Sequence, residues 1–117
     1  MQRYILLLRS TPPVNQPEMS PAEMQAIFEK FNQWRASLES RNPEGQKLRD
    51  HAGRVMRIQE GKLVVTDGPF AETRELVGGY FAYDAENFEE AVELAKDCPV
   101  LAWGAVEIRE IERLPRP

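Results

Sequence analysis

The sequence has one cysteine, Cys98, and one histidine, His51, in 117 residues. A single cysteine cannot form an intramolecular disulfide, so no disulfide framework holds the chain together. One histidine and one cysteine also provide no cluster of the nitrogen and sulfur ligands that hold zinc. We therefore expect no metal and no cofactor, and we interpret Cys98 as a packed residue and His51 as an exposed one rather than as catalytic groups.

The sequence also lacks an excess of positive charge and any long apolar run. Fifteen lysines and arginines stand against nineteen aspartates and glutamates, a formal net charge of −4. Nucleic-acid binding depends on basic residues that neutralise phosphates, so we expect no nucleic-acid partner. The apolar run from Tyr4 to Leu8 is too short for a signal peptide or a membrane span, which predicts a cytoplasmic protein with no membrane partner. A local anion site remains open for four arginines: Arg3, Arg9, Arg54 and Arg57.

A length of 117 residues suits one hydrophobic core, and we expect residues 1–117 to form a single domain. The run from Tyr4 to Leu8 predicts a buried strand. The sequence SPAE at Ser20 is a capping box, with a proline at the first helical position, and apolar residues follow at helical spacing. This pattern predicts a helix that ends before Arg41, where the stretch RNPEG would stop it.

The second half of the chain alternates strand and helix signals. Residues 54–59 and 62–66 are joined by Glu60-Gly61, which predicts a β-hairpin. A strand over 76–83, a helix capped by Asn87 and a final strand near 106–109 complete the pattern. The order is β-α-β-β-β-α-β, an α+β, ferredoxin-like plan of antiparallel strands with one extra strand or a split hairpin.

Apolar side chains occupy both odd and even positions of the predicted strands, as at Tyr80 and Phe81, so both faces of the sheet are apolar. Two helices on one face of an antiparallel sheet leave the other face without a cover. The most economical cover is the same face of a second copy, so the sequence predicts a symmetric homodimer.

The stretch TDGPFAETRE, residues 66–75, is too long and too charged for a tight hairpin turn. Asp67-Gly68 is a turn signal, but the usual Asx-turn is blocked because Pro69 has no N–H to offer. Asp67 must therefore bond further along the chain or keep its carboxylate for another partner. One interpretation is a structural corner anchored by Phe70. The other is a small-molecule pocket in which Asp67 or Glu72 acts as a general acid or base. The binding residues in that hypothesis are Gly68, Pro69, Phe70, Thr73, Arg74, Arg54 and Tyr80.

The run VTDGPFAETRE followed by LVGGYF resembles the signature of the DGPF branch of the YCII-related domain family. Arg74 stands where that branch usually has lysine, and the resemblance covers nearly the whole chain. It implies a dimeric α/β barrel in which two ferredoxin-like units pack sheet against sheet. Relatives that resemble enzymes acting on ring-cleavage products carry a histidine early in the first helix. Here Glu23 of the capping box takes that place, so no catalytic histidine is transferred.

Two functions follow as hypotheses. The first is a pocket near the DGPF stretch that performs general acid–base chemistry on a small carbonyl or lactone-like compound. The second is a non-catalytic binding or regulatory module, for which the resemblance suggests an extracytoplasmic-function sigma factor as partner. An enzyme should hold Asp67 or Glu72 partly desolvated in a cavity, whereas a module should leave them exposed and carry an apolar patch elsewhere.

Overall fold

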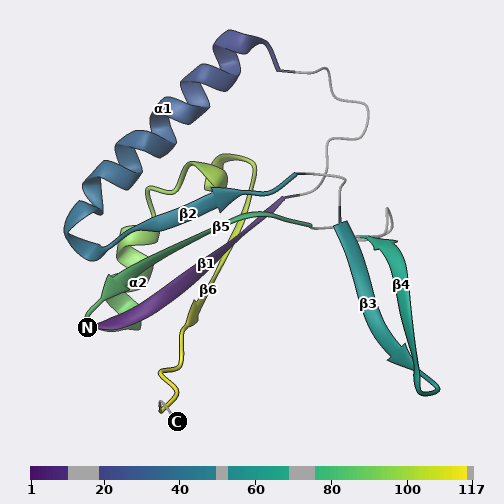
Figure 1. Cartoon of the computed structure of the whole chain (residues 1–117). Helices are drawn as coiled ribbons and strands as arrows, with labels where there is room; N and C mark the ends of the chain where they lie inside the picture. Colours follow the sequence, from purple (N-terminus) through teal and green to yellow (C-terminus); the bar gives the residue numbers. More distant parts are fainter. Residues whose placement is uncertain (11–18, 50–52, 69–75, 116–117) are drawn as a thin grey trace.

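The computed structural model describes residues 1–10, 19–49, 53–68 and 76–115. Strands and helices alternate along these ranges much as the sequence predicts (Figure 1). The elements are β1 (Gln2–Ser10), α1 (Pro21–Ser37), η1 (Glu39–Arg41), β2 (Glu44–Lys47), β3 (Gly53–Gln59), β4 (Lys62–Gly68), β5 (Leu76–Ala85), α2 (Phe88–Ala95), η2 (Pro99–Ala102) and β6 (Gly104–Glu110), where η marks a short 3-10 helix.

Four strands form one antiparallel sheet in the order β2-β5-β1-β6. This is the strand order of a ferredoxin-like unit, β-α-β-β-α-β, and it confirms the prediction of an α+β fold with two helices and an antiparallel sheet. In β1, Leu6 is buried and lies between Phe81 of β5 and Ile108 of β6. We call this sheet with its helices the body.

The core lies between the sheet and the two helices. Tyr4, Leu6 and Leu8 alternate along β1 and form one buried cluster with Trp34 of α1 and Ala91 of α2. The Trp34 ring packs on Phe81, with ring centroids 4.6 Å apart, and its indole N–H donates to the carbonyl oxygen of Leu94 at 3.0 Å. The burial of large aromatic rings and the satisfied indole fix both helices to one face of the sheet.

Both helices begin where the sequence predicts. The backbone N–H of Glu23 donates to Ser20 Oγ at 3.1 Å, and the N–H of Ser20 donates to Glu23 Oε1 at 3.3 Å, a complete capping box. At α2 the N–H of Glu90 donates to Asn87 Oδ1 at 2.8 Å. Each bond satisfies a donor that the helix itself leaves without a partner.

Strand β2 was not predicted, because Pro43 and Gly45 were interpreted only as signals that stop the helix. Gly45 lies opposite Phe81 in the β2–β5 ladder. A Cβ atom at Gly45 would lie 2.5 Å from Phe81 Cδ2, so only glycine allows the strand to pass over that ring. Gly45 therefore weakens the strand signal in the sequence, yet its lack of a side chain allows the strand to form beside Phe81.

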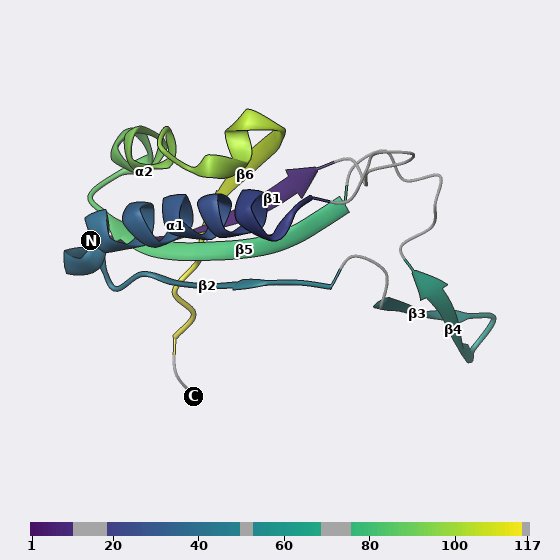
Figure 2. The same cartoon turned by 90° about the horizontal axis from the view of Figure 1, so that it is seen from above.

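The predicted hairpin is confirmed, but it does not join the main sheet. Strands β3 and β4 form a separate two-stranded sheet, inserted between β2 and β5. Its turn residues, Glu60 and Gly61, both have positive φ, 52° and 75°, as a type I′ turn requires. The hairpin stands off one end of the main sheet, on the side away from α1 (Figures 1 and 2).

Candidate functional site

The residues of the predicted site are divided between the hairpin and the main sheet. Asp67 and Gly68 end β4, Arg54 faces Asp67 from β3, and Tyr80 belongs to β5. The remaining predicted site residues lie outside the described part of the chain, and their roles stay predictions: Pro69, Phe70, Glu72, Thr73 and Arg74.

Arg54 and Asp67 form an ion pair at the base of the hairpin. Arg54 Nη1 lies 3.2 Å from Asp67 Oδ1, and the two side chains are 64% and 91% exposed. Arg54 Nη1 also donates to the carbonyl oxygen of Gly53 at 3.1 Å. An ion pair this exposed contributes about 0–1 kcal/mol, because water screens it. Within one protomer, the Asp67 carboxylate is therefore in contact with water and is not enclosed in a pocket.

Tyr80 lies on the sheet face opposite the helices, which we call the open face. It stands beside Leu7 of β1 and Gln46 of β2 in the ladders. Ile5 and Leu7 alternate with the buried residues of β1 and share this face, and all three apolar side chains are only partly buried. Tyr80 and Asp67 thus lie on different sheets, and the protomer does not unite them in one pocket.

The four arginines considered for an anion site do not gather. Arg3 is held by Asp84 at 3.0 Å and Glu44 at 3.1 Å, and Arg9 by Glu107 at 2.8 Å. The other two, Arg54 and Arg57, lie three positions apart on β3 and therefore point to opposite faces of the hairpin. Arg54 and Arg57 therefore do not converge on one anion, and Arg3 and Arg9 are each paired with carboxylates.

A polar cluster at one end of the sheet was missed in the sequence. Asn42 Nδ2 donates to Asp84 Oδ2 at 2.8 Å, and this hydrogen bond, together with the Arg3 guanidinium, lowers the pKa of Asp84. The pairing with Asp84 and Glu44 raises the pKa of Arg3 despite its partial burial. The partners come from β1, β2 and the turn before β2, so no local sequence pattern reveals them. Because the carboxylate of Asp84 is already bonded, we assign the cluster a structural role.

Glu90 of α2 extends this pattern to the helix layer. Its Oε1 accepts from the backbone N–H of Glu86 at 3.0 Å and pairs with the Arg41 guanidinium, and both contacts lower the pKa of Glu90. Arg41 also donates to the carbonyl oxygen of Asp84 at 3.4 Å. This chain of contacts ties η1 to the start of α2, which is again a structural role.

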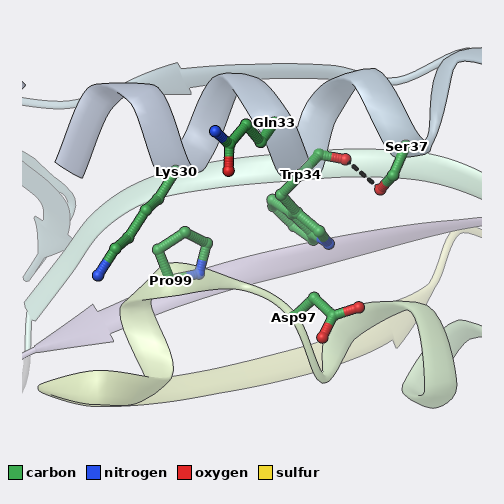
Figure 3. A pocket seen from close by; sticks show the side chains of 6 residues that line it. All are labelled: Lys30, Gln33, Trp34, Ser37, Asp97 and Pro99. Atoms are coloured by element: carbon green, nitrogen blue, oxygen red, sulfur yellow. Dashed lines mark hydrogen bonds between the residues drawn. The ribbon is translucent and has the colours of Figure 1, made fainter. Parts of the chain in front are cut away.

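A shallow groove opens between α1 and the segment that leads from α2 into β6, and its volume is about 320 Å³ (Figure 3). Trp34 lies in it, but its indole N–H already bonds to Leu94, and Ser37 Oγ donates to the Trp34 carbonyl oxygen at 2.6 Å. None of the sequence-predicted site residues that the structure describes lines the groove. Its lining consists of Lys30, Gln33, Trp34, Ser37, Asp97 and Pro99.

The rarer residues behave in part as predicted. Cys98 is buried, and burial raises the pKa of its thiol, which suits a packed residue rather than a nucleophile. Trp34 belongs to the core, whereas Trp103 is exposed. His51 lies outside the described residues. Within those described, no cluster of three His, Cys, Asp or Glu side chains is placed to hold a metal ion.

No helix in the described ranges is both long and apolar enough to span a membrane. A comparison with known proteins gives one curated relative, the uncharacterised protein R00369 of Rhizobium meliloti (strain 1021), which is 39% identical over 62 residues. That match covers 51% of this chain and 50% of the relative, so the chain spans about half of the relative's length.

The family model of the YCII-related domain matches residues 15–115, which include both helices and every strand but β1. Assignment to the DGPF branch stays a prediction from the motif. The match extends over most of the chain, and the structure has the α+β architecture that the resemblance implies. The chain belongs to the YCII-related domain family.

Proposed function

We propose that this chain is a homodimeric binding module of the cytoplasm rather than an enzyme complete in one protomer. The observation that carries the proposal is the 91% exposure of the Asp67 side chain. An acid or base at work in a pocket would be partly desolvated, and Asp67 is solvated. Large apolar side chains are exposed on the hairpin instead, which is typical of a surface that binds protein.

The homodimer is supported by the open face of the main sheet. Ile5, Leu7 and Tyr80 form an apolar strip there, and the described helices pack on the opposite face. A second copy related by a two-fold axis would cover this strip and have its own strip covered in return. Sedimentation of the purified protein tests this directly, with a dimer expected at micromolar concentration and a monomer contradicting the proposal.

The binding function is tested by calorimetry with an extracytoplasmic-function sigma factor encoded in the same genome. A regulatory module of this kind should bind with a dissociation constant in the micromolar range or below, about −8 kcal/mol. Absence of heat at tens of micromolar would remove the sigma factor as a partner and leave the homodimer untouched.

A second candidate function is general acid–base chemistry on a small carbonyl or lactone-like compound. The Arg54 guanidinium beside Asp67 favours it, since a cation 3.2 Å from the carboxylate could hold an anionic group of a substrate. Turnover of a panel of such compounds should fall about 10²–10⁴-fold in Asp67→Asn, the usual contribution of one acid or base. Arg57→Gln, on the other hairpin face, is the matched control and should leave turnover unchanged. Equal rates in the wild type and in Asp67→Asn would rule this chemistry out.

A further inference from the structure

The β3–β4 hairpin, which we now call the arm, carries its most exposed apolar side chains on one face. In the ladder Met56 lies opposite Val65 and Ile58 opposite Leu63, so all four project from the same side. Their exposed fractions are 63%, 52%, 69% and 57%. The other face pairs Val55 with Thr66, Arg57 with Val64 and Gln59 with Lys62, and its two valines are partly buried. The face of Met56, Ile58, Leu63 and Val65, which we call the arm face, therefore exposes large apolar side chains to solvent.

An isolated two-stranded ribbon is marginally stable in water, and among the described residues this one shares no ladder with the main sheet. Its four exposed side chains present on the order of 400 Å² of apolar surface, as much as the largest patch on an ordinary monomer. We expect this apolar surface to be buried against another surface, and the described residues of the protomer do not bury it.

The position of the arm indicates where that cover lies. The arm projects from one end of the sheet, on the side away from α1, which is the side of the open face (Figures 1 and 2). The molecule is thin, 49 × 46 × 19 Å, and its radius of gyration of 16.7 Å exceeds the roughly 13 Å of a compact chain of this length. The open face and the arm thus lie on two sides of a space that a second protomer could fill.

We propose that the arm of one copy packs its apolar face against the open face of a second copy, and that the two copies exchange arms reciprocally. The partner surface is the strip of Ile5, Leu7 and Tyr80. Each arm would bury on the order of 400 Å² of its own surface, so the two arms alone would contribute about 800 Å², about half of a standard stable interface.

The charge distribution favours the same occupant. Residues 53–68 carry three positive charges, on Arg54, Arg57 and Lys62, and two negative charges, on Glu60 and Asp67, so their formal charge is +1. The whole chain has a formal charge of −4, so the remaining residues have a formal charge of −5. An arm of one sign is attracted to a body of the other, which helps it to associate with a second copy.

Exchange of arms would also change the environment of Asp67. Arg54 and Asp67 occupy the same face of the ribbon as Met56 and Val65, since successive pairs in the ladder alternate faces. Packing of the arm face would move this ion pair from water to the edge of an interface. This step rests on the homodimer proposed above, and it makes the site at Asp67 incomplete in one copy.

The first experiment is sedimentation equilibrium over a wide range of protein concentration. Ile58→Asp places a charge in the arm face and should weaken dimerisation at least 100-fold. Gln59→Asp is the matched control, because it adds the same charge at the neighbouring position on the opposite face and should leave the dissociation constant within about threefold. A dimer of Ile58→Asp as tight as the wild type would overturn the exchange of arms but leave the homodimer intact. If the wild type stays monomeric at about 100 μM, both the homodimer and the exchange of arms are overturned.

The second experiment is complementation between two variants that are each monomeric. Leu7→Asp damages the open face and Ile58→Asp the arm, so a mixed pair keeps one intact arm against one intact face. We expect the mixture to form a heterodimer, whereas an arm that packs on its own chain would leave the mixture monomeric. If Leu7→Asp fails to fold by circular dichroism, Tyr80→Lys takes its place.

Labelling of carboxylates with a carbodiimide, followed by peptide mass spectrometry, tests the fate of Asp67. The label on Asp67 should fall at least fivefold in the wild-type dimer relative to the Ile58→Asp monomer, while Glu29 on α1 should react equally in both. Equal labelling of Asp67 in the two proteins would show that the ion pair stays in water and would overturn its place in the interface.

Discussion

The main sheet and the arm use the same alternation of apolar side chains and bury them to opposite degrees. Leu6 in β1 is completely buried, whereas Ile58 in β3 is 69% exposed. Strand geometry decides which residues share a face in both cases. Whether that face is buried depends on what packs on it, and the described protomer provides helices for one sheet only.

The covered sheet draws its stability from several sources at once. Strands β1 and β5 are paired on both edges, and Trp34 contacts both Phe81 and the carbonyl of Leu94. The arm has one ladder and a turn. The comparison suggests a body that folds by itself and an arm whose order depends on a partner.

The largest test of this comparison is a pair of equal truncations. Leu6→Ala leaves a cavity in the covered sheet and should lower the free energy of unfolding by about 2–5 kcal/mol. Leu63→Ala in the arm, measured at a concentration where the protein is monomeric, should change it by no more than about 0.5 kcal/mol. Chemical denaturation of both variants measures the difference. A Leu63→Ala cost as large as that of Leu6→Ala would mean that the arm packs on its own body.

The regular elements could be predicted because their signals are local. The capping box at Ser20 and the Asn87 cap mark both helix starts, and Glu60-Gly61 marks the hairpin turn. Strand β2 could not be predicted, since its presence depends on Phe81, a residue far along the chain that needs a glycine opposite. The separation of the arm from the main sheet likewise depends on tertiary contacts, which the alternation of apolar residues does not predict.

The candidate site was predictable only in its local part. The sequence placed Arg54 and Asp67 at the same end of one hairpin, and the structure brings them to 3.2 Å. Tyr80 was grouped with them by the motif, but it lies on the other sheet. The Asn42–Asp84 bond was missed because its residues are 42 positions apart and meet only through the β2–β5 pairing.

The pH dependence of stability tests the contribution of Asp84 to the body. The folded state lowers the pKa of Asp84, so the carboxylate stabilises the fold above its ordinary pKa of about 4 and loses that contribution as the pH falls through the lowered value. Asp84→Asn should therefore destabilise the protein at pH 6, by about 1 kcal/mol or less for a pair near the surface, and should weaken the loss of stability between pH 6 and pH 2.

The control for this effect is Asn42→Gly. It removes the amide that donates to Asp84, and glycine tolerates the positive φ of 52° at this position. We expect a partial reduction of the same pH dependence, measured by urea unfolding at each pH. If wild type and Asp84→Asn lose equal stability on acidification, the cluster does not contribute in the way its contacts indicate.

The smallest expected effect concerns the arm alone. Glu60 adopts a positive φ of 52°, which strains most side chains, whereas asparagine accepts it and Asn-Gly is the preferred pair in a type I′ turn. Glu60→Asn should stabilise the ribbon by some tenths of a kcal/mol, up to about 1 kcal/mol. We infer that the arm opens without unfolding the body, so hydrogen exchange should slow about two- to fivefold at the amides of β3 and β4 and stay unchanged in β1 and β5. Equal slowing in both regions would mean that arm and body open as one unit, and the arm would then have no independent need of a second copy.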